Sequence, residues 1–321
     1  MGAFENETPF AMKNLFKVSS FWGRCCLFFL LLPLSGCQKP QVSKLKQENL
    51  GPRFPTDDLN RAVELANPAQ RVVVIGPGAI ETIFALGAGA KLVGRDSYAD
   101  FPAEAKKIAI AGDYSGPSVE KCIALRPDLV LVQGETWDKA RVEQWQTQIG
   151  APVAALVATD VNGVRKGIKK IGKWLGEAKK ADGLAANIRP QAFYGQHSAF
   201  IEVGRSPLWT AGQNTLVSDV ASHGGFKNVA KVRGYQAFNL ESLLALQPET
   251  YLVPSKSSRA VVLRQLRASP TLSKLKCVKR GHVVVIHPDL LLRPGPRLMN
   301  GMALLGTEAS RLTDAKAGKR G

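Results

Sequence analysis

The stretch YSGPSVEKCIALRPDLVLV, residues 114–132, returns 121 positions later as YQAFNLESLLALQPETYLV, residues 235–253. Tyr114 matches Tyr235, Glu120 matches Glu241, and each copy ends in an apolar run typical of a buried strand. Each copy predicts a short helix that begins near the Glu and ends before the Pro. This separation is not that of a solenoid, whose period is roughly 20–50 residues. We therefore expect two similar α/β lobes with a ligand cleft between them.

The first forty residues indicate export. Basic Lys13, Lys17 and Arg24 precede the apolar run CCLFFLLLPL, residues 25–34, which is too short to span a bilayer and is typical of a secretory signal. The tetrapeptide LSGC that ends at Cys37 resembles the bacterial lipoprotein signal, and the resemblance implies cleavage before Cys37 and lipid on its sulfur. Three acyl chains would anchor the protein firmly. The alternative is an ordinary buried helix that ends in Gly-Cys.

Charge and cysteine usage narrow the class of protein. The net charge is +17, which first points to nucleic acid, but the predicted export and the lack of an aromatic-basic motif favour a solvated basic surface and no nucleic-acid partner. Two of the five cysteines leave with the signal and Cys37 carries lipid. Cys122 and Cys277 remain in different predicted lobes, so we expect free, mostly buried thiols and no zinc site.

Short apolar runs alternate with helical patterns on both sides of residue 160. The run at 72–75 predicts a buried strand, and the Gly-Pro-Gly at 76–78 matches neither a P-loop nor a dinucleotide motif, so we interpret it as a turn. In the first half, further strands are predicted at 92–93, 129–132 and 153–157, and helices at 80–86, 118–125 and 137–148. In the second half, strands are predicted at 199–203 and 283–286, and helices at 216–222 and 298–312.

The segment between the halves has a helical period. Apolar residues step by four and three from the predicted N-cap Asp160 onward and form one stripe on a mostly basic helix: Val164, Ile168, Ile171, Leu175 and Ala178. We expect one long helix that joins the lobes; an ordinary lobe helix is the alternative. The predicted organisation is a lipoprotein signal peptide (1–36), a flexible tether (37–69), an N-terminal α/β lobe (70–159), a connecting helix (160–192), a C-terminal α/β lobe (193–312) and a basic tail (313–321).

The sequence over about residues 70–312 resembles the ABC-importer substrate-binding proteins that serve cobalamin, haem and ferric siderophores. The motifs that carry the resemblance include RVVVIGP (71–77), ETIFALGAG (81–89), LRPDLVL (125–131), GGFKNVA (224–230) and PDLLLRPGPR (288–297). It implies two α/β lobes joined by one long helix, in a monomer on the periplasmic or cell-surface face of a bacterial membrane. It also implies delivery of a metal-chelate ligand to an ABC permease dimer with its ATPase. No catalytic residue and no resident cofactor are expected; the ligand itself would be a cobalt corrinoid or an iron chelate.

The resemblance also assigns roles to residues. Glu120 and Glu241 match the positions that dock to permease arginines, and helix capping is the alternative role. Gln133 and Leu290 replace aromatic residues of a cobalamin binder, which leaves a siderophore or haem as an alternative ligand. The positions that match ligand contacts are Tyr98, Tyr114, Trp209, Tyr235, Asp289 and Arg293. Aromatic faces suit a flat macrocycle such as a corrinoid, whereas Arg293 and Arg297 would suit an anionic chelate.

Two other functions are alternatives to this one. An envelope hydrolase would need a Gly-x-Ser-x-Gly elbow or a His-Glu-x-x-His helix, and the sequence has neither. The second alternative is a sensor lipoprotein that binds a ligand and signals without a permease. Only the paired residues Glu120 and Glu241 argue against it.

Overall fold

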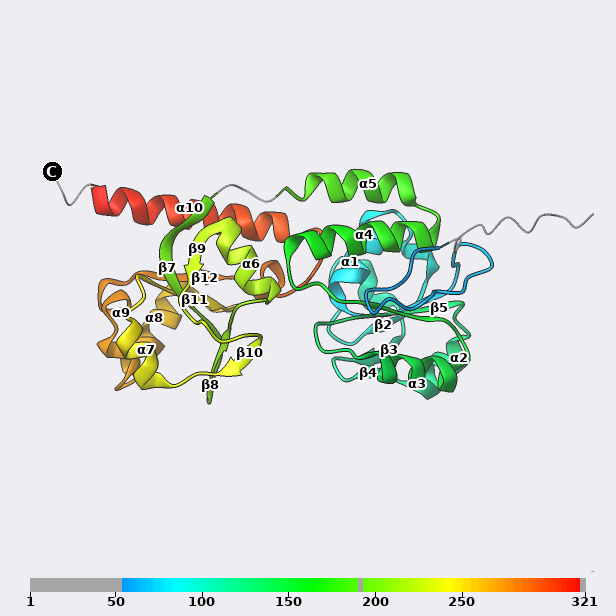
Figure 1. The fold of residues 1–321 in the computed structure, drawn as a ribbon, viewed down its shortest axis with the longest axis horizontal. Coiled ribbons are helices and arrows are strands. Elements are labelled where there is room, and N and C mark those ends of the chain that lie inside the picture. The colour runs from blue at the N-terminus through cyan, green and yellow to red at the C-terminus, as the bar shows by residue number, and fades with distance from the viewer. Residues whose placement is uncertain (1–53, 190–192, 318–321) are drawn as a thin grey trace, which may run out of the picture. The chain divides into compact units, whose positions relative to one another are not determined.

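Two six-stranded sheets form the framework of the fold (Figure 1). The computed structural model describes residues 54–189 and 193–317, which belong to one compact unit. The first sheet has the order β4-β3-β2-β1-β5-β6, and the second has the order β10-β8-β7-β11-β12, with β9 paired to β7. Each sheet lies in one half of the chain and is flanked by helices, which confirms the predicted pair of α/β lobes.

The first lobe is built on a parallel sheet. Its central strand β1 is buried throughout and pairs in parallel with β2 and β5. The carboxyl ends of these strands therefore meet at one edge of the sheet, where open α/β sheets bind their ligands. The strands are β1 (Val72–Ile75), β2 (Leu92–Asp96), β3 (Ile110–Asp113), β4 (Gly116–Pro117), β5 (Leu129–Gln133) and β6 (Val153–Leu156); the helices are α1 (Pro77–Ala85), α2 (Val119–Leu125) and α3 (Lys139–Ile149).

The second lobe mixes parallel and antiparallel pairs. Strand β11 pairs in parallel with β7 and β12, whereas β8 runs antiparallel to both β7 and β10. The strands are β7 (Phe193–Arg205), β8 (Leu208–Ala211), β9 (Gly224–Asn228), β10 (Tyr235–Ala237), β11 (Thr250–Pro254) and β12 (Val283–Ile286); the helices are α6 (Leu216–His223), α7 (Leu240–Leu246), α8 (Arg259–Ala268), α9 (Lys276–Arg280) and α10 (Leu298–Ala317).

The repeated stretch folds in the same way in both lobes. Helices α2 and α7 occupy corresponding residues, and each leads into a buried strand, β5 or β11. Both helices end at a left-handed residue directly before the proline, Arg126 with φ 47° and Gln247 with φ 40°. The internal repeat therefore identified a true structural repeat.

The segment between the lobes is a pair of helices rather than one. Helix α4 (Val161–Leu175) ends at Gly176, whose φ of 77° is left-handed, and α5 (Ala178–Asn187) begins two residues later. The helices lie side by side and antiparallel, since Arg165 donates from Nε to the Ala185 carbonyl at 3.1 Å and Lys169 pairs with Asp182 at 2.9 Å (Figure 1). The prediction of a single helix over 160–192 is therefore wrong, because a glycine C-cap lets the chain reverse.

Residues 54–69 are also not a tether, in contrast to the prediction. Phe54 and Val63 are buried, and the buried Arg61 guanidinium donates from Nη1 to Asp57 at 3.1 Å and to the Val153 carbonyl at 2.9 Å. Lys170 of α4 adds an ion pair to Asp58 at 2.6 Å. This strap, residues 54–69, packs against the first lobe because its few apolar and charged side chains find buried partners there. The rest of the predicted tether, like the signal peptide and Cys37, lies outside the described residues.

The strap is expected to contribute measurably to stability through Asp57. Its side chain is fully buried and also accepts backbone hydrogen bonds from Arg61 at 2.8 Å and Ala155 at 3.2 Å. We expect Asp57→Ala to lower the free energy of unfolding by about 2 kcal/mol, because buried donors lose their charged acceptor. Denaturant unfolding would measure this. Asp182→Ala, which removes an exposed ion pair, should cost less than about 1 kcal/mol; equal costs would show that the strap is not anchored through Asp57.

The predicted basic tail begins later than residue 313. Helix α10 continues to Ala317, Leu312 is buried, and His197 Nε2 lies 3.0 Å from the Thr313 hydroxyl. Tertiary contacts thus extend the helix beyond its apolar pattern. Among the residues that the structure describes, no helix is both long and apolar enough to cross a membrane.

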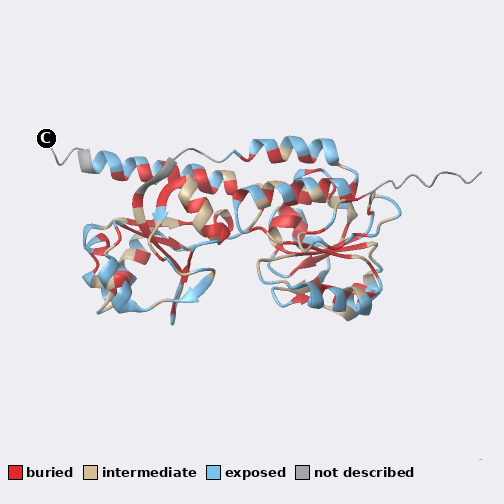
Figure 2. Cartoon of the chain, in the orientation of Figure 1, coloured by how far each residue is buried: buried red, intermediate tan, exposed pale blue. Residues whose placement is uncertain are grey.

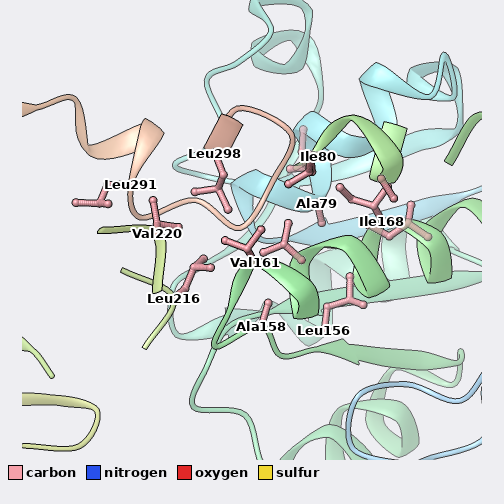
Figure 3. Close-up of a cluster of buried hydrophobic side chains, with 14 of the residues drawn as sticks. Ala79, Ile80, Leu156, Ala158, Val161, Ile168, Leu216, Val220, Leu291 and Leu298 are labelled. Atoms are coloured by element: carbon pink, nitrogen blue, oxygen red, sulfur yellow. The ribbon is translucent and has the colours of Figure 1, made fainter. Parts of the chain in front are cut away.

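One hydrophobic core runs through both lobes. Buried side chains from α1, α4, α6 and α10 meet where the lobes join, among them Ile80, Val161, Leu216 and Leu298 (Figure 3). Figure 2 shows the same distribution, with burial concentrated in the strands and on the inner faces of the helices. Asp219 of α6 also accepts the Val161 backbone N–H at 2.8 Å. The lobes are therefore packed against each other and not merely tethered.

Both cysteines of the folded domain are free and buried, as predicted. Burial raises the pKa of each thiol to about 11, so both remain protonated at pH 8. In a fragment that begins at Gln38, we expect no reaction of the native protein with a thiol reagent over an hour, and two reactive thiols per chain after unfolding. Rapid modification of the native protein would contradict the described packing.

Candidate functional site

A cavity of about 580 Å³ lies where loops of the two lobes meet at the carboxyl ends of β1, β2 and β5. This volume lies within the range of roughly 300–1,000 Å³ that is usual for small-molecule sites. The first lobe contributes aromatic and polar side chains, among them Asp96, Tyr98, Tyr114, Gln133, Glu135 and Trp137. The second lobe contributes Tyr235, Leu292, Arg293 and Pro294.

Four of the six predicted ligand residues line this cavity: Tyr98, Tyr114, Tyr235 and Arg293. Tyr98 follows β2 and Tyr114 follows β3, and their ring centroids are 6.3 Å apart at a tilt of 56°. The two side chains are 58% and 75% exposed, which is unusual for aromatic rings and leaves their faces free for a ligand. They form one aromatic wall.

The other two predicted ligand residues do not line the cavity. Trp209 lies on β8 opposite Ala237 of β10, outside the cavity. Asp289 is buried, and its carboxylate accepts from Arg293 at 3.0 Å and from Arg297 at 3.3 Å. Asp289 therefore holds Arg293 and Arg297 in place, because these two guanidinium groups occupy its oxygens.

The Gly-Pro-Gly turn brings the lobes together. Gly76 has a φ of 139° and Pro77 begins α1, which explains why the turn needs both residues. A Cβ on Gly78 would lie 2.5 Å from the Pro294 carbonyl oxygen of the second lobe. The motif thus permits a close approach of two backbones at the floor of the cavity.

Gln133 fastens this same contact. Its side-chain oxygen accepts the Ala79 backbone N–H at 2.8 Å, and its Nε2 donates to the Pro294 carbonyl at 2.9 Å. Where a cobalamin binder has an aromatic residue, this chain therefore has a hydrogen-bonded link between the lobes. The departure that the sequence showed at Gln133 has a structural role.

The arginines of the second lobe belong to an ion cluster. Arg293 contacts Glu81 at 3.1 Å, Asp100 at 2.9 Å and Asp289 at 3.0 Å. Arg297 donates from Nε to Glu81 at 2.9 Å and lies over the Phe101 ring at 4.1 Å. The hydrogen bonds that Arg297 donates to Glu81 raise the pKa of Arg297. Three carboxylates thus face two guanidinium groups, so Arg293 is not an unpaired cation that waits for an anion.

Two further carboxyl groups face the cavity. Burial raises the pKa of Asp96, which accepts the Tyr98 backbone N–H at 2.6 Å. Burial also raises the pKa of Glu135, although hydrogen bonds from Tyr235 and the Leu216 backbone act in the opposite direction. Both groups can accept hydrogen bonds from a ligand.

Sequence reasoning missed Glu135 and Trp137. Both follow β5 directly, and the rule that ligands bind at the carboxyl ends of parallel strands could have identified them. Trp137 packs edge-on against Trp145, with 5.2 Å between ring centroids. Its buried indole N–H has no partner among the described residues, which leaves a donor beside the cavity.

The two predicted docking residues lie in corresponding places. Glu120 is in the first turn of α2 and Glu241 is in the first turn of α7, and both side chains are exposed. Neither makes an ion pair that fixes it within the described chain. Each carboxylate is favoured there by the helix N-terminus and remains open to a partner.

Comparison with known proteins identifies a similar family. Residues 72–191 match the model of the periplasmic binding protein family. Over this segment the chain is similar to that family. Its relatives are binding proteins of transport systems and not enzymes, as expected from the sequence.

Several known proteins resemble the chain over most of its length. An uncharacterised ABC transporter substrate-binding lipoprotein, YvrC of Bacillus subtilis, is 29% identical over 89% of this chain and 95% of its own. A vitamin B12-binding protein of Pectobacterium atrosepticum is 25% identical over 72% of this chain and 85% of its own. A periplasmic haem-binding protein of Pseudomonas aeruginosa has a TM-score of 0.63 and 28% identity, with 74% of this chain and 91% of the other covered.

Proposed function

We propose that this protein is a lipid-anchored, extracytoplasmic substrate-binding protein that captures a corrinoid and delivers it to the permease of an ABC importer. The observation that carries the choice of ligand is the charge of the cavity. Arg293, its cation, is already engaged by Glu81, Asp100 and Asp289. The aromatic and acidic surfaces that remain suit a ligand without net negative charge.

The aromatic wall supports a flat ligand. Tyr98 and Tyr114 on one side, with Trp137 and Leu292 nearby, offer large apolar faces that lose little conformational entropy on binding. A corrin ring has broad faces of this kind. Pockets for such ligands combine apolar walls with a few placed polar groups, and this cavity has that composition.

The acidic groups support an amide-bearing ligand. A corrinoid carries amides around its rim, whose N–H groups can donate to Asp96 and Glu135. A catecholate siderophore or the propionates of haem would instead bring negative charge beside these carboxyls, which costs free energy in a poorly solvated site. The cavity therefore favours the corrinoid over the anionic chelates.

Haem remains the second candidate because a haem-binding protein is 28% identical to this chain. The exposed phenols of Tyr98 and Tyr114 are possible axial ligands for iron. For a siderophore-binding protein, or for a sensor that works without a permease, the only support is the general similarity to substrate-binding proteins.

The test is a fluorescence titration of the fragment from Gln38 with cyanocobalamin, haemin and a ferric siderophore panel. Trp137 should report occupancy because it lines the cavity, whereas Trp209 lies outside it. We expect saturable binding of cyanocobalamin with little binding of the anionic chelates. Binding of haemin or a siderophore alone would assign a different ligand to the same fold.

Docking is tested by reversing both exposed carboxylates. We expect Glu120→Lys combined with Glu241→Lys to reduce ligand uptake by roughly tenfold or more in cells with the importer, because like charges would face the permease arginines. Ligand affinity of the isolated protein should not change. Glu64→Lys with Glu104→Lys, which alters two other exposed residues, is the charge-matched control. Undiminished uptake by the docking variant would show that the assignment of Glu120 and Glu241 to docking is wrong.

A further inference from the structure

A second link between the lobes crosses the cavity on the side of β10. The Tyr235 hydroxyl of the second lobe donates to Glu135 Oε1 of the first lobe at 2.9 Å. Both side chains line the cavity. Any widening that separates the lobes on this side must therefore lengthen or break this hydrogen bond.

The strand that carries Tyr235 is short and exposed. Strand β10 has three residues, all of them exposed, and it lies at the end of the sheet with β8 as its only strand partner among the described residues. A short edge strand with few buried contacts moves at low free-energy cost. Tyr235 itself is 36% exposed.

The ion cluster on the other side is much harder to open. The Glu81 side chain is 2% exposed and Arg293 is 13% exposed, and the pair is reinforced by Asp289 and by the bond from Gln133 to Pro294. Separation of these groups would leave buried charges without partners. The two lobes are thus held firmly on the side of the ion cluster and less firmly on the side of β10.

We infer that the hydrogen bond between Tyr235 and Glu135 is a clasp that holds the ligand-free cleft narrow and must open for the ligand to enter. This inference rests on the proposed function, because it takes the cavity as the ligand site. A corrinoid with its rim of amides is larger than the drug-sized ligands that fill cavities of about 580 Å³. The closed clasp lowers the apparent affinity by the fraction of molecules that are open.

The clasp is tested first without any ligand, by acrylamide quenching of Trp137. A Trp209→Phe background removes the other partly exposed tryptophan of the fragment, since Trp145 and Trp174 are buried. We expect Tyr235→Phe to raise the quenching constant roughly twofold, because loss of the hydroxyl lets the cleft open. Gln236→Ala changes the same strand outside the cavity and should leave quenching unchanged. No rise in Tyr235→Phe overturns the inference.

For ligand affinity, the clasp predicts the opposite of what a direct contact between the Tyr235 hydroxyl and the ligand would predict. We expect Tyr235→Phe to bind cyanocobalamin about three- to tenfold more tightly, since the ring is retained and the competing hydrogen bond is gone. Weaker binding would show that the Tyr235 hydroxyl contacts the ligand, and unchanged binding would show that it affects neither the ligand nor the cleft. Either result would overturn the clasp.

Glu135→Ala provides an independent variant. It should raise the quenching constant at least as much as Tyr235→Phe, because it also removes the hydrogen bond from the Leu216 backbone N–H, and the double variant should add nothing beyond Glu135→Ala. Additive effects overturn the clasp, and an unchanged thermal midpoint confirms that each variant is folded. If the parent protein does not bind cyanocobalamin, the proposed function fails while the quenching result still decides the clasp.

Discussion

Replacement of Tyr98 and Tyr114 together by Ala is expected to weaken corrinoid binding by roughly a hundredfold. Each ring that is covered by a ligand contributes about 1.5 kcal/mol or more through apolar burial, and two rings give a change near 3 kcal/mol. Stability should barely change, because the rings are 58% and 75% exposed in the ligand-free protein. Titration calorimetry would measure the affinity, and thermal unfolding would confirm the fold.

Two control variants sharpen this prediction. Phe at both positions keeps the rings and should retain most of the affinity if stacking is the main interaction; a loss equal to that of Ala would instead indicate that the phenol hydroxyls bind the ligand. Trp209→Ala removes an exposed aromatic residue outside the cavity. A large loss in that variant would show that the ligand contacts β8, contrary to the described site.

Glu81→Gln is expected to lower the free energy of unfolding by about 4 kcal/mol, since it removes the charge of the most buried carboxylate, which both guanidinium groups of the cluster share. The Glu81 side chain is 2% exposed and contacts both Arg293 and Arg297. Glu308→Gln breaks only a partly exposed pair with Arg311 and should cost less than about 1 kcal/mol. Denaturant unfolding of both variants would make the comparison.

Glu81→Gln should also change which ligands the protein binds. With Glu81 neutral, Arg293 keeps Asp100 and Asp289 but the cluster loses one of its three negative charges, so haemin should bind more tightly than it binds the parent protein. Equal stability of Glu81→Gln and the parent would contradict the idea that this cluster fixes the lobes. Unchanged affinity for haemin would contradict the claim that the cluster suppresses anionic ligands.

The repeat in the sequence was enough to predict the two lobes, because each copy contains a complete local signal of helix, proline and buried strand. The reversal at Gly176 was not predictable in this way. The apolar period continues through Ala178, and a glycine within a helical pattern does not reveal whether the chain goes on or turns back. The packing of α5 along α4 determines that the chain turns back at Gly176.

The strap and the ligand residues show the same limit. Residues 54–69 have the composition of a linker, and only their buried partners, such as the carboxylate of Asp57 for Arg61, make them part of the lobe. Four of the matched positions, Tyr98, Tyr114, Tyr235 and Arg293, line one cavity in the structure. They could not show that carboxylates occupy Arg293, because those partners come from distant parts of the chain.

The most direct measurement is a pair of calorimetric titrations with two corrinoids that share the ring but differ at the rim. Cobinamide carries amides, and cobyrinic acid carries carboxylates at the corresponding positions. The account predicts one cobinamide per chain, with affinity at least about a hundredfold above that of cobyrinic acid. Equal affinities, or a preference for the carboxylate form, would contradict selection of a non-anionic corrinoid by the cavity.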